Sequence, residues 1–381
     1  MNKYRLMIAG LAALAVASTA SAQTVIRITG ATAYRSAVHT AIGNILNTGY
    51  TYGYSGSSLS GAGQAEFRGT TKVGNYDVDI KTSFSGSLAG IATLTTDRTI
   101  ANFLDATNLT TGGTASLTGP YDSPVTADVT FSDAAQATTR FKTPALVNNN
   151  VGVIPFVWTR NNGSTNSIAN MTSQLAQALL ANGQVPLSMF SGSETDSGIP
   201  VILVGRDADS GTRLTAFAES GYGALTMPVQ YKITGSNPIT LIDFYPTNTI
   251  EGTFYDLGQS GYASGGDIKT ALNAIGTQAY TDSNFDAGCH AVGYLSTSDA
   301  AGVNGGANNL TYNGYAYSLD NVKQGLYSFW SYEHMLWRSG LSGTKLTVSQ
   351  QLRDRILNYD ATIKLGDMKV TRQSEGAVIT R

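Results

Sequence analysis

The sequence predicts an α/β protein built from two lobes, each with a mainly parallel sheet flanked by helices. Segments with strand character are followed repeatedly by a turn of small residues and a segment with helical spacing, which is the chain order of an α/β fold. The chain of 381 residues also exceeds the roughly 250 to 300 residues that one core supports. We therefore expect two lobes of roughly 150 to 200 residues each.

The first 22 residues have the pattern of an export signal. Two basic residues, Lys3 and Arg5, precede an apolar run at 6–16, and small residues at 20–22 form a cleavage site before Gln23. The run is far shorter than the roughly 20 residues needed to cross a bilayer. We predict a signal peptide at 1–22, cleaved near Ala22, and a periplasmic or secreted protein.

Composition excludes several classes of protein. Cys289 is the single cysteine, so no intrachain disulfide can form and an ordinary hydrophobic core must hold the fold. A charged fraction of 13% and a net charge of −2 leave no basic field for nucleic acid. We therefore expect no nucleic-acid partner, and any recognition of charge must be local.

In the amino-terminal part, strands run into polar turns at three places. The expected strands are 25–29, 76–81 and 127–131; they lead into the turns 30–33, 83–87 and 132–134, and helices follow at 34–46 and from about 88. The Gly-rich, Ser-rich and Thr-rich segments 49–76 and 105–126 are predicted to be long loops or a hairpin.

The second half repeats the alternation. Expected strands are 151–159, 199–204 and 291–295, and expected helices are 172–180, 214–219 and 349–359. Thr172 or Ser173 caps the first of these helices. The almost wholly apolar strand 199–204 is typical of a parallel sheet and runs directly into the polar turn 206–213.

These turns share the chemistry of an anion site. A strand that ends in a Ser, Thr or Gly turn at a helix start presents unpaired NH groups, hydroxyls and the positive end of a helix dipole. One such turn is usually only a helix cap. Four of them can converge, because ligands of open α/β sheets lie at the carboxyl ends of the strands.

Two charged residues sharpen this hypothesis. A guanidinium such as Arg206 can donate two parallel hydrogen bonds to one tetrahedral oxyanion; the alternative is a salt bridge from Arg206 to Asp207 or Asp209. Asp133 is repulsive to an anion unless it accepts a proton that the ligand carries. Phosphate carries such a proton at neutral pH and sulfate does not, so an acidic acceptor would reject sulfate.

The same segments resemble the phosphate-binding proteins of bacterial ABC transporters, which have the two-lobed type-2 periplasmic binding protein fold. The similar segments are 202–213 (ILVGRDADSGTR), 127–134 (ADVTFSDA), 28–33 (ITGATA), 85–91, 171–190, 292–295 and 325–327. The chain departs from the family pattern at Ala31, Ala33 and Ala208, which puts the identity of the ligand in question more than the fold.

The resemblance implies a monomeric solute-binding protein, without a cofactor, that captures phosphate or a related oxyanion for an ABC transporter. Its implied ligand-binding residues are Thr32, Ala33, Ser85, Ser87, Ser132, Asp133, Arg206, Ser210, Gly211 and Thr212. Lobe one is expected to comprise 23–150 and 299–381, and lobe two 151–298.

Two alternatives remain. The first alternative is an enzyme, but the sequence offers no recognisable catalytic or metal-binding group. His39, His290 and His334 show no metal-ligand spacing, and the adjacency of Cys289 and His290 does not create a nucleophile and base. We therefore predict no catalytic activity. A secreted or surface structural protein that keeps this fold without transport is the stronger alternative. The long loops 49–76, 105–126 and 234–288 and the 20 tyrosines favour it.

Overall fold

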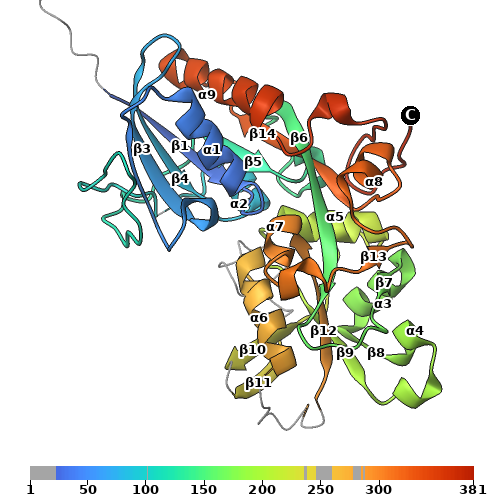
Figure 1. The fold of residues 1–381 in the computed structure, drawn as a ribbon. Helices are drawn as coiled ribbons and strands as arrows, with labels where there is room; N and C mark the ends of the chain where they lie inside the picture. Colours follow the sequence, from blue (N-terminus) through green and yellow to red (C-terminus); the bar gives the residue numbers. More distant parts are fainter. Residues whose placement is uncertain (1–22, 101, 236–237, 246–259, 278–284, 286–287) are drawn as a thin grey trace, which may run out of the picture.

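Two lobes joined by a long strand make up the fold, as seen in a computed structural model (Figure 1). The structure describes residues 23–100, 102–235, 238–245, 260–277, 285 and 288–381, so the predicted signal peptide lies outside the described residues. The long strand β6 (Val147–Arg160) pairs first with β14 (Trp330–Trp337) and then with β12 (His290–Ser296). The predicted two-lobed α/β fold is confirmed.

Lobe one has a mixed sheet in the order β2-β3-β4-β1-β5-β14-β6. Its other strands are β1 (Thr24–Gly30), β2 (Thr51–Tyr54), β3 (Gln64–Thr70), β4 (Asp77–Ser83) and β5 (Val129–Ser132). At its centre β1 pairs in parallel with both β4 and β5, while β2, β3 and β14 add antiparallel pairs. The helices are α1 (Arg35–Ile45), α2 (Ser87–Thr95), α8 (Leu319–Gln324) and α9 (Gly343–Arg355).

Lobe two continues the same strand order through β6-β12-β9-β8, with one parallel pair between β9 (Pro200–Val204) and β12. Its further strands are β7 (Asn170–Met171), β8 (Gln184–Pro186), β10 (Tyr231–Gly235), β11 (Ile239–Phe244) and β13 (Thr311–Tyr312). Its helices are α3 (Ser173–Asn182), α4 (Ser188–Ser191), α5 (Gly211–Ser220), α6 (Gly265–Thr277) and α7 (Thr297–Ala300). Nowhere in the described residues is a helix both long and apolar enough to span a bilayer.

The linking strand β6 is part of the core on both sides of the lobe boundary. Val151 is buried in lobe one, and Trp158 is buried in lobe two against Tyr294, with ring centroids 5.3 Å apart. The return of the chain to lobe one comes late, since β13 still pairs with β7 of lobe two. This pairing favours a return crossing after Tyr312 over the predicted one at residue 299.

Local signals explain where several elements begin. Thr172 Oγ1 accepts a hydrogen bond from Leu175 N at 3.1 Å, so Thr172 and not Ser173 caps α3. Helix α5 begins at Gly211, earlier than the predicted Leu214, because Ser210 Oγ accepts from Arg213 N at 3.2 Å. Segment 49–76, predicted to be a long loop or a hairpin, contains the antiparallel pair β2 and β3, with Tyr52 stacked on Phe67.

Candidate functional site

Three turns of lobe one meet at one edge of its sheet. Strands β1, β4 and β5 run in the same direction, so their carboxyl ends lie together. Gly86 N donates to Gly30 O at 2.9 Å, and Ala31 N donates to Phe131 O at 2.9 Å. Gly30 and Gly86 have φ values of 122° and 109°, which glycine adopts readily. The first two turns are thus packed against each other and against the end of β5.

Lobe two contributes the loop between β9 and α5, which contacts the same edge. Leu88 N, at the start of α2, donates to Asp209 O in this loop at 2.9 Å. Arg98 of lobe one forms an ion pair with Asp209 at 3.0 Å. The lobes therefore meet where the amino-terminal ends of α2 and α5 face each other.

Asp133 lies at the centre of this contact and is only 1% exposed. Its carboxylate accepts hydrogen bonds from Ser87 Oγ of lobe one and from Thr212 Oγ1 of lobe two, the latter at 2.9 Å. A Cβ added to Gly211 would overlap Asp133 Oδ1 and would lie 2.7 Å from Ser87 Cβ. The close approach of α5 to this carboxylate thus depends on glycine.

Opposing effects act on the charge of Asp133. Burial raises its pKa, and the hydrogen bonds from Ser87 and Thr212, together with the positive charge of Arg206, partly offset the rise. The net effect is a pKa above the ordinary value. Asp133 therefore keeps or accepts a proton more readily than an exposed aspartate does.

Arg206 is the guanidinium of the site and is 3% exposed. Its Nε donates to Tyr262 O at 3.1 Å, and its Nη2 donates to Ala263 O at 2.8 Å. The same Nη2 lies 3.4 Å from Thr32 Oγ1, across the lobe boundary. Asp209, one of the two alternative salt-bridge partners considered for Arg206, is instead paired with Arg98.

The structure brings together six of the predicted residues: Thr32, Ser87, Asp133, Arg206, Gly211 and Thr212. The other four have local contacts. Ser85 Oγ lies 3.3 Å from Thr29 Oγ1, Ser132 Oγ donates to Ala134 O at 2.6 Å, Ser210 caps α5, and Ala33 packs against the core. Their part in binding a ligand stays a prediction.

Two cations at this boundary, Arg98 and Arg35, were not predicted. Arg35 begins α1, three residues after Thr32. Burial and the nearby charge of Arg206 lower the pKa of Arg35, and Asp299 of lobe two partly offsets the effect. The available signal was a positive charge at a helix start, where the helix dipole disfavours it and where a bound anion would compensate.

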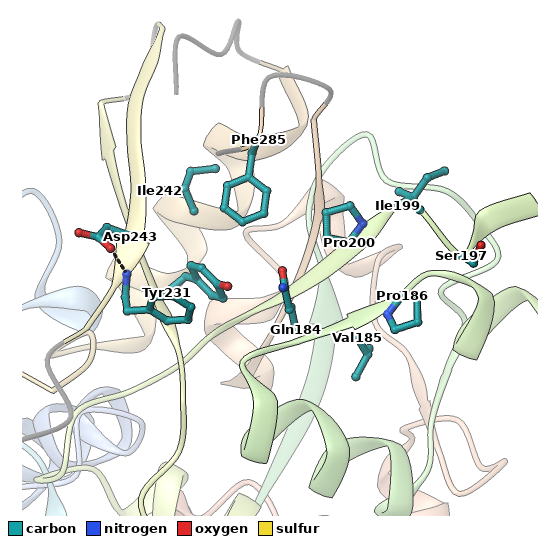
Figure 2. A pocket seen from close by; sticks show the side chains of 12 residues that line it. Gln184, Val185, Pro186, Ser197, Ile199, Pro200, Tyr231, Ile242, Asp243 and Phe285 are labelled. Carbon is teal, nitrogen blue, oxygen red and sulfur yellow. Dashed lines mark hydrogen bonds between the residues drawn. The ribbon is translucent and has the colours of Figure 1, made fainter. Parts of the chain in front are cut away.

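Lobe two also contains a cavity outside the predicted anion site. A cavity of about 870 Å³ lies in lobe two beside β8 and the β10–β11 hairpin, lined in part by Pro186, Tyr231 and Asp243 (Figure 2). None of the predicted site residues lines it. The described part of the chain contains no group of three or more His, Cys, Asp or Glu residues positioned to hold a metal ion.

The raised pKa of Asp133 predicts a pH effect on stability. Between the ordinary pKa and the folded-state pKa, the unfolded chain has ionised Asp133 while the folded chain still keeps its proton, so rising pH favours unfolding. Asp133→Asn removes this contribution. Without phosphate, we expect the melting temperature of the variant minus that of the wild type to become more positive as the pH rises from about 4, near the ordinary pKa of aspartate, to about 8. A difference that stays constant over this range would contradict the assignment.

Comparison with known proteins identifies the fold. Neither a protein-family model nor a curated protein sequence matches the chain. A solved structure from Clostridium perfringens, described as a phosphate ABC transporter substrate-binding protein with bound phosphate, is similar with a TM-score of 0.52 and 13% identity over 90% of this chain and 100% of that one. An ABC-type phosphate transport receptor from Vibrio cholerae gives a TM-score of 0.45 and 13% identity, over 87% of this chain and 94% of that one. At such identity the similarity shows the two-lobed α/β fold.

Proposed function

We propose that this protein is an extracytoplasmic solute-binding protein that captures phosphate, or a related tetrahedral oxyanion, between its lobes for an ABC transporter. The observation that carries the proposal is the position of Asp133, which is buried between the starts of α2 and α5 and bonded to a hydroxyl from each lobe. A ligand at this place would contact both lobes and would stabilise their closed arrangement.

The chemistry of the site favours an oxyanion that carries a proton. Ser87, Thr212 and the Arg206 guanidinium are donors, and the helix start at Gly211 adds backbone NH groups. Asp133 is an acceptor with a raised pKa, suited to the proton of phosphate or arsenate. Sulfate has no proton to offer at neutral pH, so it would leave a buried acceptor unpaired.

The solved structure from Clostridium perfringens supports the same role, since it has a similar fold and contains bound phosphate. The predicted export signal supports action outside the cytoplasm, where a monomeric binding protein would deliver its ligand to membrane subunits of a transporter. We propose a binding role and no catalytic one, because the donors and the acceptor of this site suffice for binding.

Binding measurements test the proposal directly. The protein is unfolded and refolded to remove any bound anion, and its melting temperature is followed with increasing phosphate, arsenate or sulfate. A ligand that binds only the folded state adds about 2.7 kcal/mol to stability at 100 times its Kd. We expect phosphate to raise the melting temperature with saturation in the micromolar range and sulfate to have no effect. No shift at millimolar phosphate would refute the proposal and favour a secreted or surface structural protein.

A further inference from the structure

Two buried polar groups near the site have no hydrogen-bond partner among the residues that the structure describes. Glu333 of β14 is 0% exposed, and within the described chain neither of its carboxyl oxygens has a hydrogen-bond partner. The same holds for the hydroxyl of Tyr34, the residue directly before α1. Buried polar groups are nearly always hydrogen-bonded, so two such exceptions at one place point to a missing partner.

Strand pairing places Glu333 beside Asp133. His334 pairs with Ser132 in the antiparallel ladder of β14 and β5, so Glu333 is level with Asp133 one position further along. Ser331, on the same face of β14 as Glu333, donates its hydroxyl to Asp133 O at 2.5 Å. The edge of the sheet that carries Asp133 therefore also carries Glu333.

Strand β6 places Tyr34 on the other side of Glu333. Glu333 pairs with Gly152, and a Cβ added to Gly152 would lie 3.0 Å from Tyr34 Oη. The Tyr34 ring packs against Phe131, two residues before Asp133, at a centroid distance of 6.1 Å. The hydroxyl of Tyr34 and the carboxyls of Glu333 and Asp133 thus lie along one edge of lobe one.

We propose that Glu333 is a second carboxyl of the anion site, neutral when the site is occupied, so that the anion and a proton on Glu333 are bound together. This inference rests on the proposed function. A neutral carboxyl adds an O–H donor to the site, whereas an ionised Glu333 would place a second negative charge beside Asp133 and the anion. Two carboxyls in one buried site resist ionising together.

The surroundings of Glu333 favour its neutral form. Burial raises its pKa well above the ordinary value, and the negative charge of Asp133 raises it further. The other charged or titratable groups around this edge are Tyr34 before α1, Asp360 after α9, Arg206 of lobe two, and His334 with its neighbour Glu375. His334 lies on the opposite face of β14, where its Nδ1 is 2.9 Å from Asn148 Oδ1.

Calorimetric titration of phosphate from pH 6 to pH 10 tests the inference with the wild type and Glu333→Gln, whose amide keeps the shape but cannot ionise. Comparing the two at each pH cancels the ionisation of phosphate itself. We expect the wild-type affinity to fall relative to the variant by up to about tenfold per pH unit once Glu333 ionises in the free protein. The ratio should stay constant below that pH.

Parallel pH profiles of the two proteins would overturn the inference, because a merely structural Glu333 changes the melting temperature but not the pH dependence of binding. Should the variant fail to fold, wild-type titrations in two buffers of different ionisation enthalpy give the same answer. They should show uptake of up to one proton more than phosphate ionisation requires, and no such uptake would refute the proposal. A wild type that binds no phosphate at any pH would instead refute the proposed function.

Discussion

Replacing Gly211 by alanine is expected to lower phosphate affinity by about tenfold or more, since one hydrogen bond to a charged group, worth about 1.5 to 3 kcal/mol, is lost. The added methyl group would overlap the Asp133 carboxylate and the Ser87 hydroxyl. To avoid this overlap, α5 must move away from lobe one, which breaks the contact of Thr212 with Asp133.

Without these contacts to Asp133 and Ser87, the substitution would not lower the free energy of unfolding. Alanine is about 1 kcal/mol better than glycine within a helix, so Gly211→Ala at an ordinary helix start would be neutral or stabilising. Gly266→Ala is the matched control, because Gly266 also lies at the start of a lobe-two helix and an added Cβ would make only an ordinary 3.4 Å contact with Ser264 Oγ. Titration calorimetry compares the two variants. Equal phosphate affinities would show that Gly211 is outside the binding site.

Much of this site follows from short-range sequence signals. A strand, a small-residue turn and a helix start are local features, so the segments around Thr32 and Ser210 could be predicted from neighbouring residues alone. Because parallel strands end at one edge of a sheet, the meeting of the turns at 83–87 and 132–134 also followed from the predicted strands. The structure confirms that these turns face the loop that begins at Arg206.

Long-range pairing accounts for what was missed. Strand β14 has no clear alternation, since Glu333 and His334 are both buried within it, and it is stabilised by pairing with β5 and β6. From the sequence alone a glutamate in a strand is predicted to be exposed, and its burial can be recognised only when both neighbouring strands are known. The sequence left segment 49–76 open between a long loop and a hairpin for a related reason, because the Gly-rich hairpin of β2 and β3 is stabilised by cross-strand aromatic contacts such as Tyr52 with Phe67.

Lobe boundaries were also difficult to predict, because one strand serves both lobes. The run 151–159 was correctly predicted as buried, but its two halves pair with different strands, β14 and β12. No sequence pattern indicates that one strand belongs to two lobes. The same strand explains how the turns of both lobes stay close, since it fixes the two sheets to each other at their common edge.

Replacing Arg206 by lysine is expected to weaken phosphate binding by about 30-fold, or about 2 kcal/mol, although the positive charge is kept. The guanidinium fork engages Tyr262 O, Ala263 O and Thr32 Oγ1 at once. These contacts occupy Nε and Nη2 and leave Nη1 for an oxyanion. A lysine ammonium has three N–H groups on a flexible chain, so it cannot keep these three contacts and also donate to an oxyanion.

Loss of a buried arginine also destabilises the fold, so the control must separate stability from binding. Arg160→Lys does so, because Arg160 is likewise buried and donates to a backbone carbonyl, that of Ile168, at 2.7 Å. Arg160 lies on β6, which is two strands away from β9 in the sheet, and its guanidinium contacts Ile168 and Asn166 rather than a residue of the site. Both variants should have a lower melting temperature than the wild type. Only Arg206→Lys should bind phosphate more weakly in calorimetric titrations. Equal affinity losses in the two variants, or none in either, would show that Arg206 does not bind the anion.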